Sequence, residues 1–154
     1  MDRIAVQVER DPLYASIISA QRSTPEATGA DAVSLAARQM AETLSVAAIV
    51  TYTSTGNTGL RTARERPLLP IIALSPKVAT ARRLSIAWGL HCVVTEDATD
   101  LEGMVDKACR VAVEQELARP GERVIVTAGV PLGTPGATNM LRIAYIGSDG
   151  LSAV

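Results

Sequence analysis

From residue 31 onward, apolar and polar positions follow two different periods. Five short apolar runs are each bounded by turn-forming or charged residues, which is typical of strands buried in a sheet. These runs lie at 46–50, 70–75, 91–95, 123–129 and 140–147. Before and between the first four runs, apolar residues recur every three or four positions, which predicts helices. The predicted helices span 31–45, 58–66, 76–88 and 99–119.

Boundary residues support two of these helices. Ser75 followed by Pro76 is typical of a helix start, because serine caps a first turn and proline fits within it. The stripe buried by that helix would run to Trp88. Thr99 and Glu102 have the spacing of a capping box. In the helix at 31–45, the residues expected to face the core are Val33, Ala37, Met40 and Leu44.

The alternation of strands and helices predicts an α/β fold. Continuously apolar strands joined by helices are typical of a parallel sheet that is covered on both faces. The connection before the last strand, "GVPLGTPGATN", has no helical period, so it does not suit a parallel crossover. We therefore expect a three-layer α/β/α domain with a five-stranded, mostly parallel sheet whose last strand is antiparallel at an edge.

The pattern of the first 22 residues predicts a segment separate from the α/β domain. Ile4 and Val8 lie one helical turn apart, and Asp11 followed by Pro12 stops one helix and starts another. The segment at 20–31 is small and polar, which is typical of a linker. The sequence therefore predicts an N-terminal helical arm and linker over 1–22 and an α/β domain over 23–154.

Composition excludes several classes of protein. The net charge of −1 gives no electrostatic basis for binding nucleic acid or an anionic membrane. No apolar stretch is long enough to span a bilayer, and the charged N-terminus is not a signal peptide. Cys92 and Cys109 lack metal-ligand spacing and are expected to be reduced, buried thiols in a cytoplasmic protein.

Candidate catalytic or metal-binding residues are weak. His91 is the only histidine, and we expect it to open the third strand, away from the loops at the other end of the sheet. Glu96, Asp97 and Asp100 follow that strand and read as a solvated turn and helix-start charge rather than a metal site. We therefore predict no catalytic residue and no metal site in this chain.

A polar loop follows the first strand. The stretch "TYTSTGNTG" combines hydroxyl, amide and glycine residues and then enters a short helix, whose N-terminus favours anions. A second glycine-rich loop, "TAGVPLGTPGATN", follows the fourth strand. If the first and fourth strands are adjacent, the two loops face each other where the strand order reverses. This composition suits a phosphate cradle, although such loops also serve as plain helix-capping connectors.

Several stretches together resemble pyruvate kinases. "TSTGNT" resembles their effector-phosphate loop, and "RERPLLPIIALSP" their R-P-x-x-P-I-I segment. "ARRLSIAWGLHCVV" and "GERVIVTAGVPLGTPGATNMLRI" are similar to two further family blocks, and "MDRIAVQVE" to the helix before the C-terminal domain. The order and spacing are specific and cover nearly the whole chain. The resemblance is to the C-terminal domain only, without the catalytic barrel.

The resemblance implies an allosteric role and a set of site residues. The residues expected to bind an effector phosphate are Thr53, Ser54, Thr55, Gly56, Asn57 and Thr58. The residues of the loop expected to close over the ligand are Pro131, Gly133, Thr134, Gly136 and Thr138. The strand residues expected at an oligomer interface are Leu141, Arg142, Ile143, Ala144 and Tyr145. The barrel of the same polypeptide would be a partner, and the intact glycolytic enzyme would use Mg²⁺ and K⁺; this chain itself is expected to hold no cofactor.

One departure bears on the ligand. Members that bind fructose 1,6-bisphosphate often carry an aromatic residue and an arginine early in the fourth helix of the domain, where this chain has Leu101 and Lys107. A monophosphate, such as a sugar phosphate or nucleoside monophosphate, is the better expectation. Three interpretations stay open: the regulatory domain of a pyruvate kinase, a free-standing phosphate-ligand module, and a small α/β enzyme of other chemistry. We favour an expressed part of a longer kinase.

Overall fold

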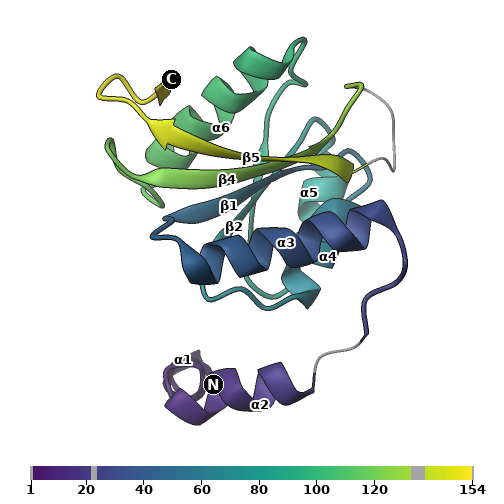
Figure 1. The fold of residues 1–154 in the computed structure, drawn as a ribbon, viewed down its shortest axis with the longest axis vertical. Helices are drawn as coiled ribbons and strands as arrows, with labels where there is room; N and C mark the ends of the chain where they lie inside the picture. The colour runs from purple at the N-terminus through teal and green to yellow at the C-terminus, as the bar shows by residue number, and fades with distance from the viewer. Residues whose placement is uncertain (1, 22–23, 133–137, 154) are drawn as a thin grey trace.

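The computed structural model describes residues 2–21, 24–132 and 138–153. The elements are α1 (Asp2–Glu9), α2 (Pro12–Ala20), α3 (Gly29–Thr43), β1 (Ala48–Tyr52), α4 (Asn57–Arg64), β2 (Ile71–Ser75), α5 (Val78–Leu84), β3 (Leu90–Val94), α6 (Leu101–Glu114), β4 (Arg123–Gly129), β5 (Thr138–Ile146) and β6 (Ser152–Ala153). Figure 1 shows the sheet between helical layers, with the arm set apart. The predicted α/β/α class is confirmed.

The sheet has the order β3-β2-β1-β4-β5-β6. The first four strands in this order are parallel, and β5 is antiparallel to β4, as predicted. The predicted number of five strands is wrong, because β6 pairs with the end of β5 through Tyr145 and Ile146. A strand of two residues is too short to show any apolar period. Tyr145, expected at an oligomer interface, therefore already has a strand beside it.

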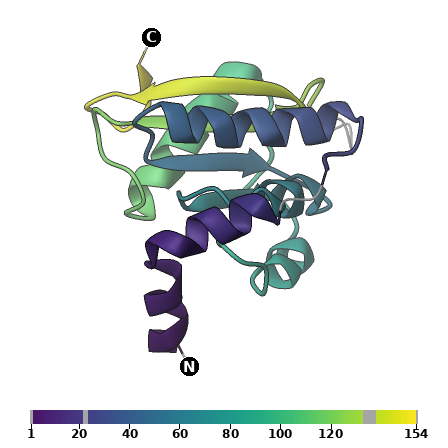
Figure 2. The same ribbon diagram turned by 60° about the horizontal axis from the view of Figure 1, so that its bottom comes forward.

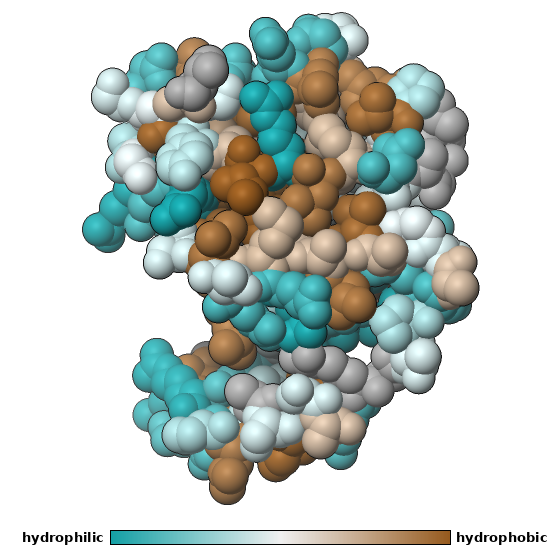
Figure 3. Space-filling view, in the orientation of Figure 1, coloured by the Kyte–Doolittle hydropathy of each residue, from teal (hydrophilic) through white to brown (hydrophobic). Residues whose placement is uncertain are grey.

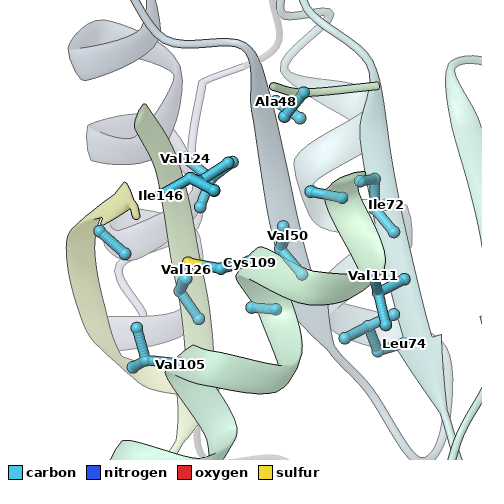
Figure 4. Packing of buried hydrophobic residues seen from close by; sticks show 14 residues of the cluster. Ala48, Val50, Ile72, Leu74, Val105, Cys109, Val111, Val124, Val126 and Ile146 are labelled. Carbon is cyan, nitrogen blue, oxygen red and sulfur yellow. The ribbon is translucent and has the colours of Figure 1, made fainter. Parts of the chain in front are cut away.

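Each face of the sheet has its own core. The larger core lies under α6, where Val50, Ile72 and Val126 of the sheet pack with Val105 and Cys109 of the helix (Figure 4). The smaller core lies under α3 and includes Ile49 and Ile125, the neighbours of Val50 and Val126 along the same strands. Alternate strand residues thus serve opposite faces, and all of these strand residues are fully buried.

Local capping explains where the helices begin, and it corrects two predictions. The expected cap at Ser75 is wrong, because the N-cap of α5 is Lys77, which makes no side-chain cap bond. The predicted cap at Asp11 is confirmed, since its side chain accepts a hydrogen bond from Leu13 N. The helix after β3 is capped by Asp100, which accepts from Gly103 N, rather than by Thr99. Aspartate is among the strongest N-caps, which explains the shift by one residue.

The third helical prediction is too long. Helix α5 ends at Leu84, whereas the predicted buried stripe ran on to Trp88. Trp88 lies beyond the helix in the turn before β3, next to Gly89 with φ +70°. The turn that ends the helix thus comes four residues earlier than the position of Gly89 suggests.

The arm consists of α1 and α2, which lie outside the layers in both views (Figures 1 and 2). Their apolar residues are largely exposed, with Ile4 at 66% and Leu13 at 67%. The arm therefore gains little stability from apolar burial against the domain.

Candidate functional site

The strand order reverses between β1 and β4, which are adjacent and parallel. The loops that leave the carboxyl ends of these two strands therefore start side by side, as the sequence predicted on the condition of that adjacency. In open α/β sheets this crevice is the usual place for a ligand. Both loops that were singled out for their polar composition thus begin at one edge of the sheet.

The first loop ends in an N-cap that leaves the helix without a side-chain cap. Gly56 is the N-cap of α4, with φ +92° in the left-handed region, and as a glycine it has no side chain to cap the first turn. Thr53 is buried, and its Oγ1 accepts a hydrogen bond from Gly56 N at 2.8 Å, which shapes the turn. The first-turn N–H groups of α4 and the positive end of its dipole are therefore directed at the crevice edge.

A hydroxyl pair joins the two loops. Thr58 Oγ1 lies 2.7 Å from Thr138 Oγ1, and both residues are buried. Asn139 braces the second loop, because its side chain accepts from Val130 N at 2.8 Å and donates to Val130 O at 2.6 Å. The bond between the threonines places two predicted site residues together, although 80 positions separate them in the chain.

The other predicted site residues divide into three groups. Ser54 and Thr55 are half-buried, and Asn57 is exposed at the first position of α4. Pro131 is exposed beside Val130. The remaining loop residues that were predicted, namely Gly133, Thr134 and Gly136, lie outside the described residues.

Helix α5 supports the loop between β1 and α4, and the sequence analysis did not predict this role of α5. Thr80 Oγ1 donates to Ser54 O at 3.0 Å, and Arg83 donates through its guanidinium to Thr55 O. A Cβ at Gly56 would lie 3.0 Å from Arg83 Nη2. A cation therefore stands beside the positive end of α4, whose first turn contains no acidic residue. The arginine pair in "ARRL" was the only sequence signal for this.

A buried charge network holds α4 against α3. Asp31 is fully buried and accepts from Arg61 Nε at 3.0 Å, from Arg64 Nη2 at 2.6 Å and from Glu26 N at 2.8 Å. The hydrogen bond from Arg64 is the main reason that the pKa of Asp31 is lowered from its usual value, against the opposing effect of burial. The pKa of Arg64 is raised by the same bond. The carboxylate thus stays charged and clamps the helix that carries Thr58.

The network extends along α3. Glu65, nearly buried at the end of α4, lies 3.6 Å from Arg64 Nη2 and 4.0 Å from Arg38 Nε. Arg38 Nη1 in turn contacts Glu42 Oε1 at 2.5 Å. Arg38 Nε is buried and has no hydrogen bond among the described residues. Three arginines and three carboxylates therefore tie the two helices together.

The residues considered for metal or acid–base chemistry do not assemble. Within 2–21, 24–132 and 138–153, no three His, Cys, Asp or Glu side chains gather in a way that would hold a metal. His91 is exposed and its Nε2 lies 2.7 Å from Gln115 Oε1. Burial raises the pKa of the Cys109 thiol to about 11, which keeps it protonated and unreactive near neutral pH. In the same ranges, no helix has the length and apolar character needed to cross a bilayer.

Comparison with known proteins decides the family. Residues 31–144 match the family model described as pyruvate kinase, alpha/beta domain. The chain belongs to the pyruvate kinase family, as its C-terminal α/β domain. It is 55% identical to a pyruvate kinase of Methylorubrum extorquens over 146 residues, which is 95% of this chain and 30% of that protein. It is 36% identical to one of Agrobacterium vitis over 147 residues, 96% of this chain and 31% of that protein.

More distant pyruvate kinases match over the same length. One from Geobacillus stearothermophilus is 35% identical over 146 residues, 95% of this chain and 25% of that protein. The chain therefore spans about a quarter to a third of the relatives that it matches. The predicted resemblance to the C-terminal domain of pyruvate kinases is confirmed.

Proposed function

We propose that this chain is the allosteric and self-associating domain of a pyruvate kinase and that it binds a phosphorylated effector. In the longer enzyme it would regulate a neighbouring catalytic barrel in the cytoplasm. That barrel would transfer a phosphoryl group between phosphoenolpyruvate and ADP, which is a step of glycolysis. The observation that carries the proposal is the hydroxyl pair between Thr58 and Thr138, which joins both candidate loops at the switch point of the sheet.

The charge around the loop favours an anionic ligand. The first turn of α4 has no acidic residue and no side-chain cap, and the guanidinium of Arg83 contacts the loop at Thr55. Two positive features therefore lie together, and a phosphate group of about −1.5 to −2 charge near neutral pH would neutralise both.

The surroundings favour one phosphate rather than two. Lys107 stands near the place where bisphosphate-binding relatives are expected to hold the second phosphate, but its Nζ donates to Glu96 O at 2.7 Å. Leu101, at the start of the same helix, offers no hydrogen bond to a ligand from its side chain. We therefore propose a sugar monophosphate or nucleoside monophosphate as the effector class.

Thr58→Ala is expected to weaken binding of such a monophosphate by about ten- to hundredfold. The substitution removes a hydroxyl that would donate to a charged group, and such a hydrogen bond contributes about 1.5–3 kcal/mol. Isothermal titration calorimetry would first screen monophosphates and inorganic phosphate on the wild-type chain, and then compare the variant with the best binder.

Thr43→Ala is the matched control, because the hydroxyl of Thr43 bonds Gln39 O within its own helix, at the end of α3. This variant should bind with wild-type affinity. Equal affinities of wild type and Thr58→Ala would place the phosphate elsewhere.

Self-association is proposed to use the free edge of β5. Ile146 N donates to Glu122 O and Ile146 O accepts from Gly121 N, so the backbone of Ile146 faces β4. Because backbone groups alternate along an antiparallel strand, those of Ile143 and Leu141 point away from β4. Beyond the short stretch covered by β6, no other described strand pairs with this edge, which leaves its donors and acceptors available to a second copy.

An apolar face continues from that edge. Figure 3 shows hydrophobic side chains gathered over α3 and β5. Val33 and Met40 of α3 and Leu141 and Ile143 of β5 are half-buried there. Pairing two copies about a two-fold axis would extend the sheet and bury this face in one isologous contact.

Ile143→Pro is expected to abolish self-association while the chain stays folded. Proline removes the outward-facing N–H of residue 143, and edge positions tolerate proline. Sedimentation equilibrium at several concentrations would give the dissociation constant, and circular dichroism would verify the fold. Ala144→Pro is the contrasting variant, since its N–H faces β4 and its loss should destabilise the monomer itself. A wild-type chain that is monomeric at about 100 μM would overturn the proposed interface.

The described residues do not fit the Mg²⁺ and K⁺ of the intact enzyme. They bring together no carboxylate cluster, and we propose that these ions bind in the barrel instead.

A further inference from the structure

The position of the arm needs an explanation other than apolar burial. Val8 at the end of α1 is 51% exposed, and Ile17 in α2 is 51% exposed. Exposed apolar side chains give no net attraction to the domain. A specific polar contact is therefore the better candidate for fixing the arm.

Such a contact exists between α1 and the turn before β3. Glu9, the last residue of α1, accepts a hydrogen bond from Trp88 Nε1 at 2.7 Å. The guanidinium of Arg66 lies over the Trp88 ring, 4.3 Å from its centroid. The arm thus holds Trp88 by its indole N–H, and Arg66, two residues after the end of α4, holds it by the face of its ring.

The backbone around Arg66 is specialised for this position. Arg66 has φ +49°, which is uncommon for a residue other than glycine. Its N–H donates to Ala63 O at 3.0 Å, which closes the last turn of α4, and Pro67 directly after it is buried. The end of α4 is therefore well defined. The position with positive φ, where glycine is the common residue, is occupied by Arg66, whose guanidinium lies over the indole.

We propose that Glu9, Trp88 and Arg66 form a latch that fixes the N-terminal arm against the end of helix α4. The carboxylate of Glu9 supplies a charge-assisted acceptor for the indole N–H. The guanidinium of Arg66 holds the ring by a cation–π contact. The latch sets the direction in which the arm leaves the domain, and it is independent of any ligand at the crevice.

The sole tryptophan makes the latch directly measurable, because the chain has a single indole N–H. Nuclear magnetic resonance would follow its hydrogen exchange and the backbone relaxation of α1 in the full chain. Glu9→Ala should speed indole exchange about tenfold and make α1 more mobile, since it removes a hydrogen bond to a charged group. Arg66→Ala should speed exchange about two- to fivefold.

Two controls make the test specific. Gln7→Ala applies the same truncation to an exposed residue of α1 and should leave both measurements at wild-type values. Glu9→Gln retains an oxygen acceptor and should fall between wild type and Glu9→Ala. In the double variant Glu9→Ala/Arg66→Ala, exchange should rise by less than the product of the single effects, as expected for groups that share one partner.

The latch is overturned if Glu9→Ala leaves indole exchange at the wild-type rate. It is equally overturned if exchange accelerates while the relaxation of α1 does not change, because the hydrogen bond would then exist without holding the arm.

Discussion

Asp31→Ala is expected to lower the free energy of unfolding by about 3 kcal/mol, the low end of the cost of breaking a buried ion pair. Asp31 is fully buried and accepts hydrogen bonds from Arg61, Arg64 and Glu26 N. Its loss removes the carboxylate that Arg61 and Arg64 share and leaves Arg64 with the longer contact to Glu65 Oε1, at 3.6 Å. Both arginines are partly exposed, at 29% and 37% of their side chains, so water relieves some of the penalty.

Urea denaturation would measure this loss. Glu114→Ala, an exposed change on α6, should alter stability by less than about 0.5 kcal/mol. If Asp31→Ala unfolds at the wild-type urea concentration, the network contributes nothing net to folding and only selects the arrangement of α3 and α4.

The same carboxylate makes stability depend on pH. The pKa of Asp31 is lower in the folded chain than in the unfolded one, so its contribution is complete above the ordinary aspartate pKa and is lost as the pH falls through the folded value. The stability difference between wild type and Asp31→Ala should therefore be constant near neutral pH and shrink below about pH 4. A difference that stays constant to lower pH would mean that the carboxylate is not the source.

Gly56→Val is expected to destabilise the domain by about 3 kcal/mol. A left-handed conformation costs an L-residue about 1–2 kcal/mol, and overpacking a close contact adds about 1–3 kcal/mol. Gly56 has φ +92°, and its added Cβ would lie 3.0 Å from Arg83 Nη2 and 3.2 Å from Leu84 Cδ2. The substitution therefore strains the turn and presses the loop away from α5.

Gly29→Val is the matched control, because a Cβ built at Gly29 would meet no described atom within 4 Å apart from its chain neighbours and the nearby backbone of its own helix. It should change stability by less than about 0.7 kcal/mol, the range of ordinary helix propensities. Folded Gly56→Val should also bind a monophosphate at least about tenfold more weakly, as a displaced loop loses a charged hydrogen bond. Wild-type stability in Gly56→Val would show that the loop relaxes freely and is not held in one shape.

The sheet could be predicted because its signals are local. Strand β4 spans Arg123–Gly129 as its apolar run predicted, and the antiparallel direction of β5 followed from a connection without helical period. The short strand β6 escaped detection because two residues carry no period. The end of α5 at Leu84 was missed because the apolar spacing continued to Trp88, although that residue serves the contact with Glu9 instead of the core.

The polar part of the site could be predicted only where composition marks a loop. The hydroxyl-rich stretch around Thr58 is visible in sequence, and Thr138 was included through a family resemblance. The periodic pattern of α3 placed apolar residues inward, whereas the helix also buries Asp31 and Arg38. These charges face α4 and meet partners up to 33 residues away. Periodicity along one helix cannot reveal a partner that another helix supplies.

The charge network between α3 and α4 restricts how this domain can evolve. Among the described residues its members are three acids and three bases, namely Asp31, Arg38, Glu42, Arg61, Arg64 and Glu65. A single substitution that removes one of these charges takes a partner from at least one other member, whereas joint replacement by apolar residues of similar volume is often neutral or favourable. Evolution by single substitutions therefore tends to keep these charged residues. Homologues that lack one of them should differ at several of the six positions together.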